Sequence, residues 1–182
     1  MVKTDQNMVL LPEYAGKIER ILVKEGLRNF LKRKIPCLGI EPTKSTATQA
    51  ISRGINTLKD FYGAELAKLI RKQSGEADLI ICNNVYAHVP DINDFTRAIE
   101  ISLSENGVVS IEFPHLLNLI KYCQFDTIYH EHFSYLSVKT VKKIFEENNY
   151  WKLPLPDTLT NIDDWYVNED IFNYYRLLIS NN

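Results

Sequence analysis

The sequence lacks the features that would point to nucleic acid or to a membrane. Its longest basic run is Lys32-Arg33-Lys34 and its net charge is -2, so it has no electrostatic footprint for nucleic acid. No stretch approaches the roughly 20 apolar residues of a membrane span, and the N-terminus has no apolar signal region. We therefore expect a soluble, cytoplasmic protein that binds neither nucleic acid nor a membrane.

Cysteine is also scarce. The three cysteines, Cys37, Cys82 and Cys123, are an odd number and form no Cys-x-x-Cys pair. Two of them lie inside apolar stretches, where a free thiol packs as a small hydrophobic group. Buried, reduced thiols are the expected state.

What is present is ordinary globular usage, with 45% hydrophobic and 24% charged residues in 182 positions, enough for one domain. Short apolar runs alternate with helical periods. We predict strands at 35–40, 55–62, 79–82 and 107–114, and helices at 43–53, 63–72, 92–103, 115–125 and 137–148. Such alternation predicts right-handed crossovers and a parallel sheet, so the fold class is α/β, doubly wound.

The segment before the first of these strands has a helical pattern. Apolar residues recur at helical spacing over 17–34, which predicts one amphipathic helix, interrupted at Gly26. Residues 17–26 contain no Gly-x-Gly spacing and no obvious strand.

The predicted strand at 79–82 runs directly into polar residues. Asn83, Asn84 and His88 follow it, and Pro90 with Asp91 then opens a helix. In open α/β sheets, ligands bind beyond the carboxyl ends of the strands. This strand end is therefore the first candidate site.

A carboxylate, Glu41, follows the predicted strand at 35–40. In nucleotide-binding α/β folds, an acidic residue at this place accepts hydrogen bonds from ribose hydroxyls. A solvated glutamate at a turn would give the same pattern, so the residue alone leaves both interpretations open.

The run Tyr129-His130-Glu131-His132 allows three interpretations. A His-x-His pair could ligate a metal, but a third ligand from a distant position would be required. The side chains could simply satisfy buried polar groups. In the third interpretation, a histidine oriented by a neighbouring Glu and Tyr moves a proton in general acid-base catalysis.

Taken together, four segments resemble a known family of enzymes. They are Gly-Ile-Glu-Pro (39–42), Asn-Asn-Val-Tyr-Ala-His-Val-Pro-Asp (83–91), Ile-Glu-Phe-Pro-His (111–115) and Gln-Phe-Asp-Thr-Ile-Tyr-His-Glu-His-Phe-Ser-Tyr (124–135). In wording and order they are similar to the S-adenosylmethionine-dependent C-methyltransferases of keto-deoxysugar nucleotides, over about residues 27–149. The resemblance implies a Rossmann-like, class I methyltransferase fold and S-adenosylmethionine as cofactor. It also implies a small-molecule substrate, a nucleoside-diphosphate 4-keto-6-deoxysugar methylated at carbon 3.

The resemblance also implies roles for single residues. Glu41 would hold the cofactor ribose, with Asn83 also assigned to the cofactor. His132 would be the catalytic base, supported by Tyr129 and Glu131, whereas Asn84 and His88 would face the sugar. Alternation along an extended segment does not choose between His130 and His132, but the motif selects His132. No metal is required, because the methyl sulfonium is already activated.

The sequence departs from the family at both ends. Family members have a first strand with a glycine turn, a zinc-binding N-terminal domain and a C-terminal domain, and we expect these to be missing or rewritten. We assign residues 1–149 to a methyltransferase-like domain and 150–182 to a divergent tail, which either covers the sheet edge or is unrelated sequence. The alternative function is a catalytically inactive remnant that serves as a binding module. The sequence does not indicate an oligomeric state.

Overall fold

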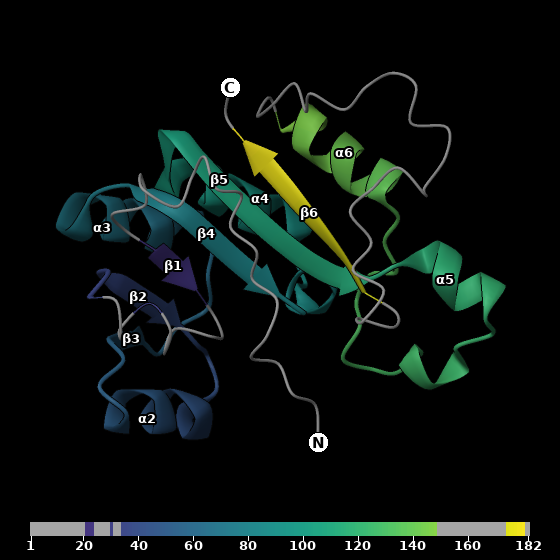
Figure 1. The fold of residues 1–182 in the computed structure, drawn as a ribbon, viewed down its shortest axis with the longest axis horizontal. Coiled ribbons are helices and arrows are strands. Elements are labelled where there is room, and N and C mark those ends of the chain that lie inside the picture. Colours follow the sequence, from purple (N-terminus) through teal and green to yellow (C-terminus); the bar gives the residue numbers. More distant parts are fainter. Residues whose placement is uncertain (1–20, 24–29, 31–33, 149–173, 181–182) are drawn as a thin grey trace.

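The computed structural model describes residues 21–23, 30, 34–148 and 174–180, which form a six-stranded sheet in the order β3-β2-β1-β4-β5-β6 (Figure 1). The strands are β1 (Ile21–Val23), β2 (Cys37–Ile40), β3 (Thr57–Leu58), β4 (Ala77–Asn83), β5 (Leu103–Pro114) and β6 (Tyr174–Ser180). The helices are α2 (Lys44–Ser52), α3 (Ala64–Ser74), α4 (Ile92–Ser102), α5 (Leu116–Lys121) and α6 (Val138–Glu147), with short 3-10 turns η1 (Tyr86–His88) and η2 (Phe125–Thr127).

Strands β1 to β5 are parallel, and β6 is antiparallel to β5. The predicted strands around Leu38, Thr57, Ile80 and Val109 thus lie parallel in one sheet, which confirms the α/β, doubly wound fold class. The predicted helix start at Asp91 is also confirmed, because the Asp91 carboxylate accepts a hydrogen bond from the Asp94 amide at 2.9 Å.

The single helix predicted over 17–34 is wrong at its centre. Ile21–Val23 is a strand, with Leu22 in register with Leu38 on one side and with Ile80 on the other. Three consecutive apolar residues fit a short strand flanked by parallel neighbours as well as they fit a helix turn, and here the pairing decides. The first strand, which we expected to be missing or rewritten, is present. Gly26 lies outside the described residues, and so does the segment after β1 in which family members have the glycine turn.

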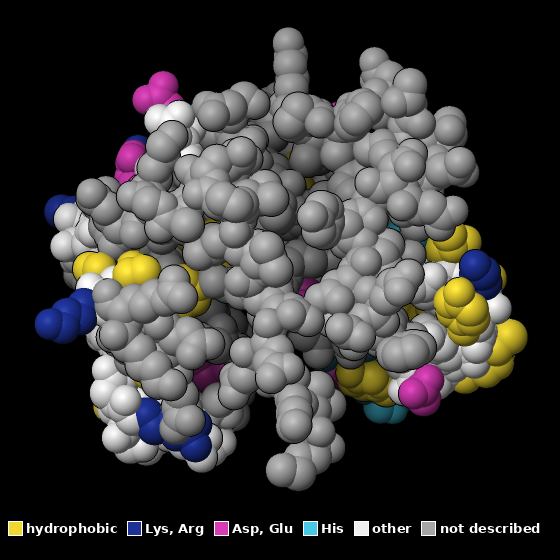
Figure 2. Space-filling view, in the orientation of Figure 1, with side chains coloured by type: hydrophobic (Ala, Val, Ile, Leu, Met, Phe, Trp, Pro, Cys, Tyr) yellow, Lys and Arg dark blue, Asp and Glu magenta, His cyan; other side chains and the backbone are white. Residues whose placement is uncertain are grey.

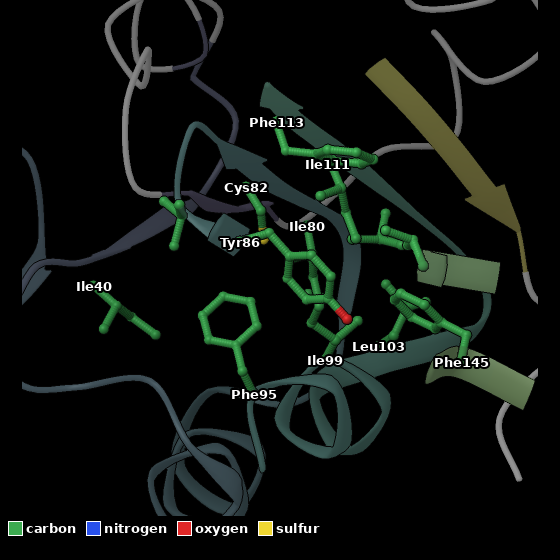
Figure 3. Packing of buried hydrophobic residues seen from close by; sticks show 14 of the residues in the cluster. Ile40, Ile80, Cys82, Tyr86, Phe95, Ile99, Leu103, Ile111, Phe113 and Phe145 are labelled. Atoms are coloured by element: carbon green, nitrogen blue, oxygen red, sulfur yellow. The ribbon is translucent and has the colours of Figure 1, made fainter. Parts of the chain in front are cut away.

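One face of the sheet carries the main core, which lies against α3, α4 and α6. Figure 3 shows Tyr86 and Phe95 packed between the sheet and a helix, and their ring centroids are 5.8 Å apart. Side chains alternate along β4, so Ile80 and Cys82 join this core. Leu79 and Ile81 instead join a smaller cluster with Phe30 and Val108, on the opposite face.

The tail returns to the sheet. Residues of β6 pair along β5, from Val108 opposite Ser180 to Pro114 opposite Tyr174. Of the two alternatives for the tail, covering the sheet edge is the one that this strand fulfils, because it lies alongside β5 (Figure 1). The domain division at residue 149 stays a prediction.

The expectation of buried thiols is met only in part. Cys82 is buried, but Cys37 is half-buried and Cys123 is exposed, so the expectation of buried thiols is wrong for Cys123. Burial raises the pKa of the Cys37 thiol.

Among the helices that the structure describes, none has the length and apolar character needed to cross a membrane.

The core contains a buried hydroxyl chain whose loss should be measurable. The Tyr86 hydroxyl lies 2.7 Å from Thr96 Oγ1, and Thr96 Oγ1 donates to the Ile92 carbonyl at 2.7 Å. Tyr86 must therefore be the donor to Thr96. We expect Tyr86→Phe to lower the free energy of unfolding by about 0.5–1.5 kcal/mol in urea denaturation, the usual net value of one such bond. Exposed Tyr122→Phe is the control and should change it little; an equal loss in both variants would contradict the assignment.

Candidate functional site

The carboxyl ends of the parallel strands bring the predicted site residues to one edge of the sheet. Glu41 follows β2, and Asn83 ends β4. Between these strands lies β1, which pairs with β2 on one side and β4 on the other. The chain order reverses direction here, and such a switch point is where open α/β sheets bind ligands.

Glu41 is held in place at this edge. Its side chain is only 5% exposed, and Oε1 accepts a hydrogen bond from the Thr43 amide at 2.9 Å. Its own amide donates to the Leu58 carbonyl at 3.0 Å, which ties it to β3. A carboxylate can accept several hydrogen bonds, so a fixed Glu41 retains capacity for a ligand hydroxyl.

The two asparagines at the end of β4 have different surroundings. Asn83 Oδ1 is buried and has no hydrogen-bond partner within the described part of the chain. Asn84 is exposed, has a positive φ of 49°, and its amide donates to the Glu112 carbonyl at 2.9 Å. Asparagine tolerates this left-handed conformation, so Asn84 turns the chain out of β4 into η1.

A loop from the C-terminal half of the domain is fastened onto η1. The Ala87 carbonyl accepts hydrogen bonds from the Phe133 amide at 2.9 Å and from the Ser134 amide at 3.2 Å. These bonds bring the rings of His88 and His132 together, with centroids 4.5 Å apart in an edge-to-face arrangement. Two residues that the sequence separates by 44 positions thus form one site.

Hydrogen bonds define which nitrogen of His132 is basic. Nδ1 lies 2.8 Å from the Thr127 carbonyl, which can only accept, so Nδ1 carries a proton. In the neutral ring, Nε2 is then an acceptor, and the Tyr129 hydroxyl lies 3.1 Å from it. His132 is only 8% exposed. A buried imidazole with Nδ1 anchored has Nε2 as its acceptor, which suits a general base once the Tyr129 hydroxyl has moved away.

We expected the segment 129–132 to be extended, but it is not. The His132 amide donates to the Tyr129 carbonyl at 3.1 Å, so the segment turns and places both side chains on one side, with ring centroids 4.3 Å apart. His130 is exposed, which separates it from His132. Glu131 is also exposed and makes no hydrogen bond or ion pair with the described residues. Its predicted support of His132 stays a prediction.

Within the described ranges, no group of three His, Cys, Asp or Glu side chains is arranged to hold a metal ion.

An apolar surface, which we did not predict, lies beside the site. The only sequence signal for it is the series of apolar residues in and after α5. Figure 2 shows hydrophobic side chains at the surface where Figure 1 places α5. The exposed members are Leu117, Ile120, Tyr122, Phe125, Ile128 and Phe133.

His115 ends the motif at 111–115, and the sequence suggested no role for it. It is 3% exposed, and its ring joins two helix starts: Nδ1 lies 3.2 Å from the Leu117 amide, and Nε2 lies 3.3 Å from the Val138 amide. Both neighbours are donors, so a doubly protonated ring would face them with like polarity. Burial also lowers the pKa of His115.

This lowered pKa makes folding sensitive to acid. Below the ordinary histidine pKa of about 6.5, His115 binds a proton in the unfolded chain but not in the folded protein. The contribution of His115 to the free energy of unfolding is therefore complete above that pH and falls as pH drops toward the lowered pKa. We expect a smaller loss of unfolding free energy between pH 7.5 and 5.5 in His115→Gln than in the wild type. Exposed His130→Asn should keep the wild-type dependence, and the same slope in all three proteins would contradict the role of His115.

Residues 22–153 match the model of a family described as "Methyltransferase domain". The C-methyltransferase NovU of Streptomyces niveus is 35% identical over 111 residues, which are 61% of this chain and 26% of NovU. The chain thus spans about a quarter of the length of this relative.

Solved structures show the same fold at low sequence identity. A SAM-dependent methyltransferase from Archaeoglobus fulgidus is 17% identical with a TM-score of 0.62, over 92% of this chain and 88% of that one. A SAM-dependent methyltransferase from Thermotoga maritima, a possible histamine N-methyltransferase, is 12% identical with a TM-score of 0.61, over 91% and 83%. The fold is therefore Rossmann-like, as in class I methyltransferases. Since the family model matches well over half of the sequence, the chain belongs to the family of methyltransferase domains.

Proposed function

We propose that the chain is the core of an S-adenosylmethionine-dependent C-methyltransferase that methylates carbon 3 of a nucleoside-diphosphate 4-keto-6-deoxysugar. The observation that carries the proposal is the anchored His132: the Thr127 carbonyl fixes Nδ1, which makes Nε2 the acceptor, and the ring lies against that of His88. The similarity of the chain to a C-methyltransferase over 111 residues supports carbon as the methyl acceptor.

The residues at the switch point fit the cofactor. Glu41 is a buried carboxylate with remaining acceptor capacity, suited to ribose hydroxyls. Asn83 Oδ1 is a buried acceptor that lacks a partner among the described residues, and a ligand N–H or O–H would satisfy it. S-adenosylmethionine supplies an activated methyl group to the carbon nucleophile and leaves as the neutral thioether.

The chain must make that nucleophile. The carbonyl at carbon 4 acidifies the C–H bond at carbon 3, and His132 Nε2 takes the proton while the bonding electrons pass into the enolate. The new C–C bond then forms from carbon 3. An enolate oxygen needs a hydrogen-bond donor, and His88 and Asn84 lie on the side from which we expect the sugar to enter.

In this proposal the Tyr129 hydroxyl donates a hydrogen bond to two different acceptors in turn. Its hydroxyl donates to Nε2 in the free protein, so it must leave before His132 can take a substrate proton. Once displaced, the same O–H is a donor that can move to the enolate oxygen. Tyr129 is 42% exposed, which leaves its ring room to move. This exchange keeps Nε2 satisfied in the free protein and releases it to the substrate.

Two measurements test the proposal separately. Titration calorimetry of the purified chain with S-adenosylmethionine should show binding. In deuterated water, the chain should exchange the carbon-3 proton of a nucleoside-diphosphate 4-keto-6-deoxyglucose, because His132 acts before methyl transfer. Absence of cofactor binding would instead favour an inactive binding module. Binding without proton exchange would remove His132 from the role of base.

A further inference from the structure

Two buried side-chain oxygens in the described part of the chain have no hydrogen-bond partner, and their residues lie on neighbouring strands. They are Asn83 Oδ1, at the end of β4, and Ser110 Oγ, on the neighbouring strand β5. Ser110 is only 3% exposed. A buried polar group without a partner is costly and rare, so each instance in a folded protein requires an explanation.

Register and alternation put both side chains on the same face of the sheet. Asn83 pairs with Glu112, and Ser110 pairs with Ile81, so the two polar residues are diagonal neighbours on adjacent strands. Cys82 and Ile111, the residues next to them in sequence, point into the main core. Asn83 and Ser110 therefore face the opposite side, the side of the smaller cluster that contains Ile81.

This face is at the switch point. Val23, the last residue of β1, pairs with Ile81, so β1 ends before it reaches the level of Asn83. Asn83 thus lies where β4 extends past its neighbour, and Ser110 lies one row deeper. A ligand group at this position would meet an amide oxygen and a hydroxyl together.

We propose that Ser110 completes a polar subsite with Asn83 and that this subsite binds an ammonium or hydroxyl group of a ligand. Asn83 Oδ1 accepts only and Ser110 Oγ can accept, so a group with two or more N–H or O–H bonds, or one hydroxyl with a bound water, satisfies both. The inference rests on the proposed function, which supplies two sources: the ammonium of S-adenosylmethionine and a hydroxyl of the sugar.

The proposal predicts opposite signs for stability and for binding. In the free protein no described residue offers Ser110 Oγ a hydrogen bond to offset its desolvation, so Ser110→Ala should raise the melting temperature by about 2 to 4 °C. The same variant should bind its ligand roughly tenfold more weakly, because the hydrogen bond to the ligand is lost. Substitutions at binding sites commonly raise stability while they weaken binding.

The matched control is Ser102→Ala. Ser102 is 2% exposed like Ser110, but its Oγ lies 2.8 Å from the Tyr62 hydroxyl. Losing that partner should lower the melting temperature, and ligand affinity should stay as in the wild type. A purely structural role for Ser110 would make its variant behave like this control.

Calorimetric titrations identify the source of the donor. The probes are S-adenosylmethionine, methylthioadenosine, which lacks the ammonium, and TDP-glucose. Weaker binding of S-adenosylmethionine alone assigns the ammonium; weaker binding of TDP-glucose alone assigns a sugar hydroxyl. Unchanged affinity of Ser110→Ala for probes that the wild type binds, or a lower melting temperature, overturns this subsite only. A wild type that binds no probe overturns the subsite and the proposed function together.

Discussion

His132→Asn is expected to lower the rate of methyl transfer to a 4-keto sugar nucleotide about 10²- to 10⁴-fold, the usual contribution of a positioned base. The Thr127 carbonyl fixes the Nδ1–H of His132 and so presents Nε2 as the acceptor. An asparagine amide can still donate to that carbonyl, but its oxygen is not basic enough to take a proton from carbon. The loss should therefore be in the chemical step, and single-turnover measurement of methyl transfer checks it.

The matched control is His130→Asn. His130 is two residues away in the same loop but exposed, so its replacement should cost much less. Cofactor affinity should barely change in either variant, because neither residue is assigned to the cofactor. Near-normal turnover in His132→Asn together with loss in His130→Asn would reverse the assignment. If the wild type, even joined to the flanking domains of its relatives, does not exchange the carbon-3 proton with solvent, the base mechanism is wrong.

The parallel sheet could be predicted because its strands carry a strong local signal. Leu79 to Cys82 is short, apolar and covered on both faces, and the helices beside it have clear periods and caps such as Asp91. Strand β1 could not be predicted, since three apolar residues within a helical pattern are ambiguous until their partners are known. Long-range pairing with Leu38 and Ile80 resolves this.

The candidate site shows the same limit. The motif selected His132 over His130, and this choice stays a prediction, although the structure buries His132 and exposes His130. The sequence did not predict the turn that brings Tyr129 onto His132, because alternation describes only extended chain. Nor could it predict the contact of His88 with His132, which depends on backbone bonds to Ala87 from the Phe133 and Ser134 amides. A single atom that lacks a partner among the described residues, such as Ser110 Oγ, cannot be recognised from a sequence.

Glu41→Ala is expected to weaken S-adenosylmethionine binding by about 1.5 to 3 kcal/mol, the range for hydrogen bonds to charged groups. This is roughly a ten- to hundredfold rise in Kd, which titration calorimetry resolves. The variant also removes the acceptor of the Thr43 amide before α2, so a separate loss of stability is expected. Binding must therefore be measured well below the melting temperature of the variant.

Glu41→Gln separates these two effects. Its amide oxygen can still accept from the Thr43 amide, so most of the stability should return, but it accepts from ribose hydroxyls without a charge. We therefore expect its affinity to lie between those of the wild type and Glu41→Ala, with a melting temperature near the wild type. Tight binding in Glu41→Ala would show that the ribose is held elsewhere. Equal affinity in Glu41→Gln and Glu41→Ala, both weak, would mean that the charge of Glu41 and not its acceptor geometry holds the cofactor.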